Sequence, residues 1–131
     1  MNLSRFISIS LVAVLAAFVT ACVPTRDVSV SPVQASSRNL ATAKAHMAAA
    51  LKDPESMKIR NVSHYKTAEG DWIVCGEMDA KNSFGGYNGY SPFYFRLQGN
   101  TVKKAHFGDD SDWLATTACT QSASGTIKVA A

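Results

Sequence analysis

The first 22 residues determine which part of this chain is available to fold. They read MNLSRFISISLVAVLAAFVTAC, with one positive charge at Arg5 and an apolar run over residues 6–19. The run is shorter than the roughly 20 apolar residues that a transmembrane helix needs. A short apolar run followed by small residues is typical of a secretion signal that is removed. We therefore predict that residues 1–21 are a signal peptide and take no part in the fold.

The residue after the predicted cleavage point indicates lipid attachment. Residues 19–22, Val-Thr-Ala-Cys, match the lipobox of bacterial lipoproteins, in which the cysteine carries lipid. The alternatives are an uncleaved signal anchor and a simple signal followed by a chance cysteine. Lipidation of Cys22 would hold the protein on a membrane of the cell envelope. The next residue is Val23 and not the aspartate that retains lipoproteins in the inner membrane of enteric bacteria, which favours the outer membrane, facing the periplasm.

Two cysteines remain once Cys22 is assigned to lipid. Cys75 and Cys119 would lie in an oxidising compartment, where an isolated pair most often forms a disulfide. A catalytic thiol or a metal site is the alternative, but neither cysteine belongs to a Cys-x-x-C motif or has a His-x-x-x-His companion. We predict a Cys75–Cys119 disulfide.

The size and charge of the chain restrict its partners. Removing 21 of the 131 residues leaves 110, which suits a single domain. This part carries 12 basic and 10 acidic residues, without a run of five like charges. So weak and scattered a charge does not favour nucleic-acid binding. The sequence contains no nucleotide-binding loop and no zinc motif, so we expect no cofactor.

Hydrophobic periodicity predicts an α+β domain over residues 36–131, after an extended tether over residues 22–35. Ser36 or Ser37 can cap a helix that reaches about Lys52, with its apolar residues at steps of three and four. Strands are expected at 59–65, 72–80, 91–97 and 101–107, a short helix at 113–119, and 126–129 is compatible with a short final strand. We expect the first helix to pack on an antiparallel sheet of three to five strands.

Two segments, 51–62 and 74–95, carry a recurrent pattern. It comprises Asp53, Pro54, Ser56, Arg60, Asn61, Val62, Cys75, Gly76, Glu77, Lys81, Asn82, Ser83, Gly85, Gly86, Tyr87, Gly89, Tyr90, Pro92 and Phe93. The pattern resembles that of a family of small proteobacterial and prophage-borne lipoproteins of uncharacterised activity. The resemblance covers about half of the mature chain and implies a shared fold more than a function. It also raises a prophage origin and a role in altering the host surface.

The loop over residues 82–90 is the best candidate for a binding site. Its glycines permit positive φ angles, and its aromatic residues offer large rigid faces of the kind found in recognition surfaces. The candidate binding residues are Asn82, Phe84, Tyr87, Asn88 and Tyr90. The alternative is a loop that packs internally, with aromatic residues that cover the end of the sheet.

Two carboxylates form a second, weaker candidate. Glu77 and Asp79 are two residues apart on a predicted strand and therefore share one face. Paired carboxylates can carry out acid–base chemistry or bind a cation. More often they are exposed polar positions.

These features lead to three hypotheses about function. The first is a lipid-anchored, non-enzymatic envelope protein that binds another envelope protein or peptidoglycan. The second is an inhibitor of a hostile envelope-degrading enzyme such as lysozyme. The third, which we rank last, is a hydrolase that uses Glu77 and Asp79.

Overall fold

The computed structural model describes residues 22–131, so the predicted signal peptide lies outside the described residues. In chain order the elements are β1 (Thr25–Pro32), α1 (Ser37–Ala50), η1 (Pro54–Ser56), β2 (Lys58–Thr67), β3 (Trp72–Asp79), β4 (Ser91–Gln98), β5 (Thr101–His106), η2 (Asp109–Ser111), α2 (Asp112–Ser124) and β6 (Thr126–Ala130). The strands form one antiparallel sheet in the order β5-β4-β3-β2-β1-β6. The predicted α+β class is confirmed, but the sheet has six strands and not three to five.

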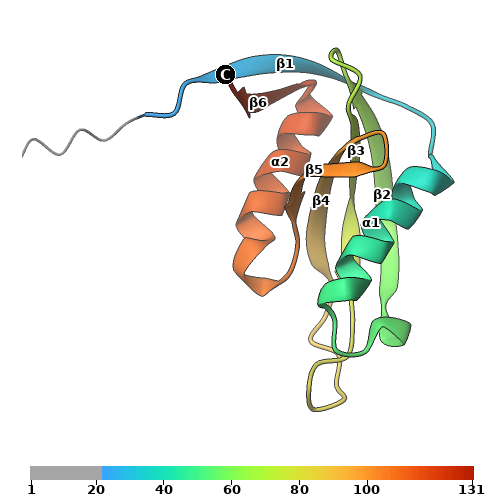
Figure 1. The fold of residues 1–131 in the computed structure, drawn as a ribbon. Coiled ribbons are helices and arrows are strands. Elements are labelled where there is room, and N and C mark those ends of the chain that lie inside the picture. Colours follow the sequence, from blue (N-terminus) through green and yellow to red (C-terminus); the bar gives the residue numbers. More distant parts are fainter. Residues whose placement is uncertain (1–21) are drawn as a thin grey trace, which may run out of the picture.

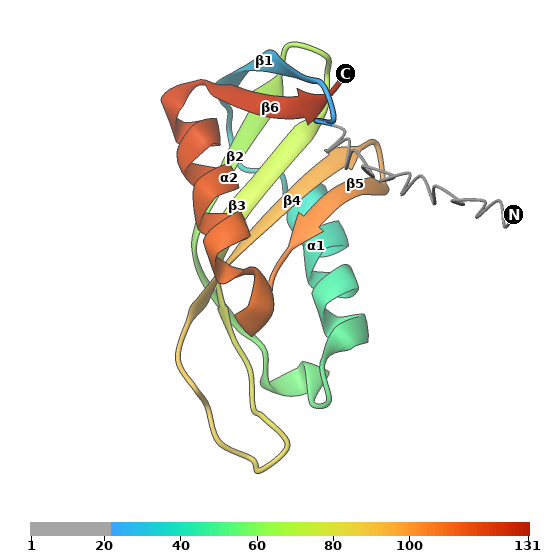
Figure 2. The same ribbon diagram turned by 90° about the vertical axis from the view of Figure 1, so that its left-hand side faces the viewer.

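The two helices cover opposite faces of the sheet (Figures 1 and 2). Alternation along β4 produces both cores: Phe93 and Phe95 point toward α1, whereas Tyr94 between them points toward α2. Helix α1 contributes Met47 to its core, and α2 contributes Ala115 to the other. None of the helices within residues 22–131 is both long and apolar enough to span a bilayer.

Helix α1 follows the predicted pattern closely. Ser36 is the N-cap, and its side chain accepts a hydrogen bond from the backbone N–H of Asn39. Ala43 and Met47, four residues apart, are fully buried against the sheet. The helix ends at Ala50, because the chain turns extended at Leu51 just before the Asp-Pro pair.

The predicted tether over residues 22–35 is wrong in most of its length. Residues Thr25–Pro32 form β1, which pairs with β2 on one side and with β6 on the other. Val28 and Val30 alternate with polar residues and are buried in the α2 core. The two prolines that suggested a tether, Pro24 and Pro32, stand at the ends of the strand, where they disturb no internal ladder bond.

The C-terminal part is more regular than predicted. Helix α2 continues five residues beyond the expected end at Cys119, to Ser124. Gly125, with φ of 93°, ends the helix in the left-handed conformation that glycine adopts at little cost. The chain then forms β6, in agreement with the strand pattern at residues 126–129, and this strand occupies one edge of the sheet.

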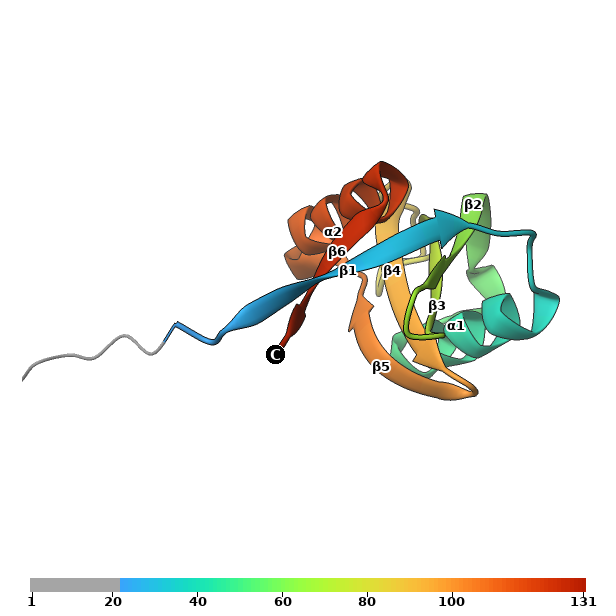
Figure 3. The same ribbon diagram turned by 90° about the horizontal axis from the view of Figure 1, so that it is seen from above.

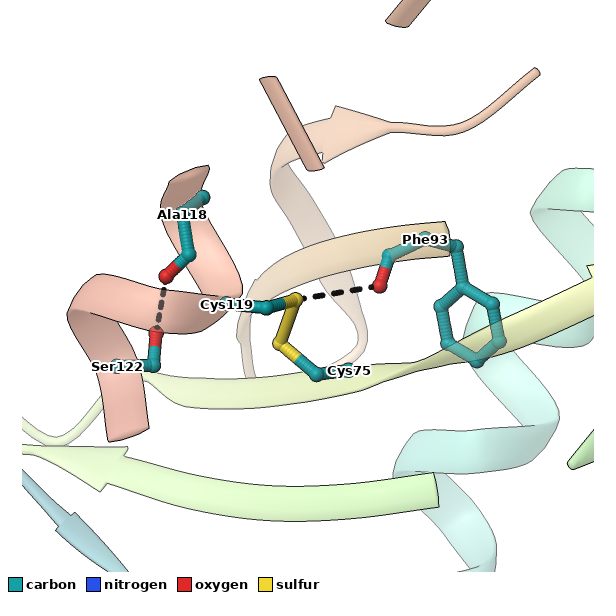
Figure 4. Close-up of a disulfide and its surroundings, with 5 residues drawn as sticks. All are labelled: Cys75, Phe93, Ala118, Cys119 and Ser122. Atoms are coloured by element: carbon teal, nitrogen blue, oxygen red, sulfur yellow. Dashed lines mark hydrogen bonds between the residues drawn. A yellow bond between two sulfur atoms is a disulfide. The ribbon is translucent and has the colours of Figure 1, made fainter. Parts of the chain in front are cut away.

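The predicted disulfide is present and joins α2 to the middle of the sheet (Figure 4). Cys75 lies on β3 and Cys119 on α2, with their Cα atoms 5.9 Å apart. The Sγ atom of Cys119 lies 3.4 Å from the carbonyl oxygen of Phe93. Because a sulfur in a disulfide has no hydrogen to donate, this is a packing contact in the oxidised protein.

His64 makes the stability of this fold dependent on pH. Its side chain on β2 is buried, and its Nε2 atom has no hydrogen-bond partner within residues 22–131. Burial lowers the pKa of His64, and burial together with the charge of Lys104 lowers the pKa of His106. The unfolded chain therefore takes up protons before the folded chain does.

We expect the free energy of unfolding to fall as the pH is lowered from 7.5 to 5.5. The contribution of the two histidines is complete above their unfolded pKa of 6.5 and is lost as the pH falls through their folded pKa values. Urea titrations at both pH values measure the loss, and the changes His64→Gln and His106→Gln should each reduce it. A pH dependence that survives the double variant unchanged would contradict this assignment.

Candidate functional site

The candidate site is the loop over residues 82–90, called the aromatic loop below, which connects β3 to β4. It projects from the end of the domain opposite β1 and β6 (Figures 1 and 2). Its base is closed by a bridge between Lys81 and Tyr87. The loop is therefore a narrow extension of the β3–β4 pair and does not lie flat on the sheet.

Asn82 organises the turn within the aromatic loop. Its Oδ1 atom accepts hydrogen bonds from the backbone N–H groups of Phe84 and Gly86, at 2.9 and 3.1 Å. Its Nδ2 atom donates to Oδ1 of Asn88 at 3.0 Å, which joins the two arms of the loop. Gly85 has φ of 80°, which a residue with a side chain seldom adopts. Of the predicted binding residues, Asn82 and Asn88 thus hold the loop in shape.

The two tyrosines fix the loop to β2 and η1. The Tyr87 hydroxyl donates to the carbonyl oxygen of Ser56 at 3.0 Å, and Lys58 Nζ lies 4.1 Å from the centre of its ring. The guanidinium of Arg60 lies 3.7 Å from the centre of the Tyr90 ring. Each tyrosine therefore already uses a hydroxyl or a ring face within the domain.

Phe84 is the predicted binding residue with no internal role. Its side chain is 98% exposed, the most exposed large apolar residue in the described chain. The apolar ring of Phe84 is in contact with water, so burying it against a partner is favourable. Because hydrogen bonds already hold the loop, little conformational freedom is lost on binding. Trp113, in the first turn of α2, is 67% exposed.

A small cavity lies beside the aromatic loop. It has a volume of about 220 Å³ and is lined by Asn82, Asn88 and Asp79 together with Gly108 and Asp109. Asp109 stands three residues before α2, so the cavity joins the loop to the start of that helix. The exposed Trp113 is therefore at the same end of the domain as Phe84.

The carboxylate pair has the predicted shared strand face but different surroundings. Glu77 Oε2 accepts hydrogen bonds from Arg60 Nε at 3.0 Å and from Asn61 Nδ2 at 2.6 Å. These hydrogen bonds, first from Asn61 and then from Arg60, lower the pKa of Glu77 and keep it ionised. Asp79 is buried at the far end of the strand. Within residues 22–131 no group of three or more His, Cys, Asp or Glu side chains could hold a metal ion.

Residues that the recurrent pattern singled out meet at this end of the fold. Ser56 Oγ donates to the carbonyl oxygen of Asp53 and accepts from the backbone N–H of Lys81, at 2.7 and 2.8 Å. The Asp-Pro-x-Ser turn therefore supports the base of the aromatic loop, as do Arg60 and Asn61 through Glu77 and Tyr90. Ser56 and Lys58 were not among the predicted site residues. Ser56 belongs to the recurrent pattern, whereas only the position of Lys58 two residues after it pointed to that lysine.

The comparisons with known proteins leave the site to be interpreted from its own geometry. No protein-family model, curated protein or solved structure matches this chain.

Proposed function

We propose that this protein is a lipid-anchored, non-enzymatic component of the bacterial envelope that binds a partner through the aromatic loop. The lipobox at Cys22 supports the anchor, and the partner is another envelope protein or peptidoglycan. The observation that carries the proposal is Phe84, which is 98% exposed on a loop held by backbone hydrogen bonds to Asn82 Oδ1 and by the hydrogen bond that the Tyr87 hydroxyl donates. Burying such a ring on association favours binding, because little order has to be created.

The position of the loop agrees with this role. It lies at the end of the domain opposite β1, and β1 begins three residues after Cys22. A protein anchored at Cys22 would therefore hold the strand β1 near the membrane and extend the aromatic loop away from it, where a partner is accessible.

We expect Phe84→Ala to weaken partner capture at least 30-fold, the effect of losing a hot spot of about 2 kcal/mol. Photo-crosslinking from position 84 in the lipidated protein, followed by mass spectrometry, would identify the partner. Asn82→Ala should weaken capture as well although Phe84 is retained, because the loop loses its internal hydrogen bonds. The matched control is Asn100→Ala, in the β4–β5 turn at the other end of the sheet. Equal capture of the identified partner by Phe84→Ala and by the wild type would remove the loop from the proposal.

A second candidate is an inhibitor of a hostile envelope-degrading enzyme such as lysozyme. The narrow projecting loop favours it, because a rigid loop with an apolar tip can enter an enzyme cleft. The purified protein should then slow members of a lysozyme panel, and Phe84→Ala should relieve the inhibition. Full activity of every lysozyme in excess inhibitor would eliminate this candidate.

A hydrolase that uses Glu77 and Asp79 is the least supported candidate. The hydrogen bonds from Arg60 and Asn61 occupy Glu77 and favour its ionised form, which suits a structural carboxylate better than a general acid.

A further inference from the structure

A second cavity in the described chain is separate from the aromatic loop. It has a volume of about 420 Å³ and lies between α2, the β4–β5 pair and β6. Figure 3 shows the curled sheet with its two edge strands, β5 and β6, and with α2. Residues of all three elements line this cavity. The cavity thus lies at the place where the sheet does not close on itself.

The walls of this cavity are basic. The basic residues that line it are Arg96, Lys103, Lys104 and Lys128, and none of the described lining residues is acidic. Two of the four have a carboxylate nearby: Lys128 Nζ is 2.8 Å from Asp27 Oδ1, and Arg96 Nε is 3.7 Å from Asp71 Oδ2. Lys103 and Lys104 take part in no ion pair within residues 22–131. The cavity therefore has two positive charges that no neighbouring carboxylate balances.

Arg96 adds a third positive charge to the wall formed by β4 and β5. Its Nε atom is buried and has no hydrogen-bond partner in the described chain, because Asp71 Oδ2 at 3.7 Å is beyond hydrogen-bond distance. His106 lies two residues after Lys104 on β5, and its ring stacks on the ring of Tyr94. Both His106 and Tyr94 line the cavity. Lys104 contributes to the lowered pKa of His106, which agrees with a positive potential inside the cavity.

The cavity is also close to the proposed membrane anchor. Its β6 wall includes Lys128 and Ala130, which pair with Asp27 and Thr25 at the start of β1. The backbone N–H of Ala131 donates to the carbonyl oxygen of Pro24 at 2.9 Å, which extends this pairing beyond the strand. Cys22 precedes β1 by only three residues, which span at most about 11 Å. The β6 wall of the cavity therefore lies near Cys22.

We propose that this cavity binds the phosphate group of an anionic phospholipid in the membrane that carries the protein. Phosphate oxygens would accept from the ammonium groups of Lys103 and Lys104, as they commonly do at clustered basic side chains, and the positive charge of Arg96 would add to the attraction. The headgroup source rests on the proposed lipid anchor at Cys22, whereas the preference for a phosphate rests on the cavity alone. A bound headgroup would orient the domain on the bilayer in addition to the anchor.

The test is an NMR titration of the full-length mature protein in neutral detergent micelles. Phosphatidylglycerol added to the micelles should shift the amide signals of Lys103 and Lys104 in a saturable way, with a smaller effect of inorganic phosphate at equal concentration. A nearby phosphate should also raise the pKa of His106. The variant Lys103→Gln/Lys104→Gln, which changes two exposed side chains, should bind about 30-fold more weakly. The matched control, Lys44→Gln/Lys52→Gln, removes the same charge outside the cavity and should bind like the wild type.

The outcomes separate the parts of the proposal. Equal loss of lipid binding in both double variants would mean that net charge, and not the cavity, attracts the lipid, and it would overturn the proposal. If neither phosphatidylglycerol nor inorganic phosphate shifts the signals of Lys103 and Lys104, the proposal is overturned as well. Mass spectrometry of the N-terminal peptide tests the anchor independently. If that peptide carries no acyl groups and inorganic phosphate still shifts the signals, the anion site is supported and the headgroup assignment is overturned. The aromatic loop has its own, separate test.

Discussion

Replacing Cys75 and Cys119 by alanine is expected to lower the free energy of unfolding by about 4 kcal/mol. The disulfide joins residues 44 positions apart and restricts the unfolded chain, and the chain-entropy estimate for a loop of about 45 residues gives this value. In a domain of this size the change corresponds to a fall in melting temperature of roughly 15 °C. The loss should be large because the bond joins α2 to the centre of the sheet.

Urea denaturation with and without reductant measures this effect, in a chain that carries Cys22→Ser so that no third thiol can exchange. The reductant should bring the wild-type disulfide chain to the stability of the double alanine variant and leave that variant unchanged. If the wild type and the variant unfold at the same urea concentration under oxidising conditions, the disulfide contributes nothing to stability.

Removing the Phe93 side chain is the second change for which we expect a loss of about 4 kcal/mol. The ring of Phe93 is fully buried on β4 opposite Gly76 of β3. A Cβ atom built on Gly76 would lie 2.6 Å from Cζ and 2.9 Å from Cε1 of this ring, closer than atoms can pack. Gly76 is therefore the residue that makes room for Phe93, and Gly76→Ala alone should cost about 2 kcal/mol.

The two changes should compensate each other. In the Phe93→Ala background the added methyl group enters the space that the ring has left, and the backbone oxygen of Arg60 at 3.2 Å remains close to it. Gly76→Ala should therefore cost much less stability there than it costs alone. A double-mutant cycle in urea should give a coupling of about 2 kcal/mol, whereas independent sites would add. Additive losses would show that the contact between Gly76 and Phe93 does not explain the glycine.

The sequence predicted which loop forms the candidate site, but not which of its residues hold the loop in shape and which are free to bind. The cluster of glycine, asparagine and aromatic residues at 82–90 indicated an irregular recognition loop. It did not indicate that Tyr87 would donate to Ser56 or that Arg60 would lie on the Tyr90 ring, because these partners are about 30 residues away in the sequence. Only the fold distinguishes Tyr87 and Tyr90, which hold the loop, from Phe84, which is free to bind.

The strand β1 shows the same limit for secondary structure. Val28 and Val30 carry the alternation of a strand, but the flanking prolines and serines equally suit an extended linker. A strand is stable only when partners satisfy its backbone groups, and those of β1 come from β2 and from β6, about 100 residues later. Local pattern cannot supply that information.

The sequence by itself determined the helix after Ser36, the central strands and the pairing of Cys75 with Cys119. Capping, periodicity and turn chemistry act over a few residues, and two cysteines leave one pairing once Cys22 is set aside for the predicted lipid. The tertiary structure alone decided that the sheet has six strands, that Gly76 lies opposite Phe93, and that a basic cavity forms between β5 and β6. These features depend on which side chains a curled sheet brings together from distant segments, and such contacts are fixed by packing rather than by local preference.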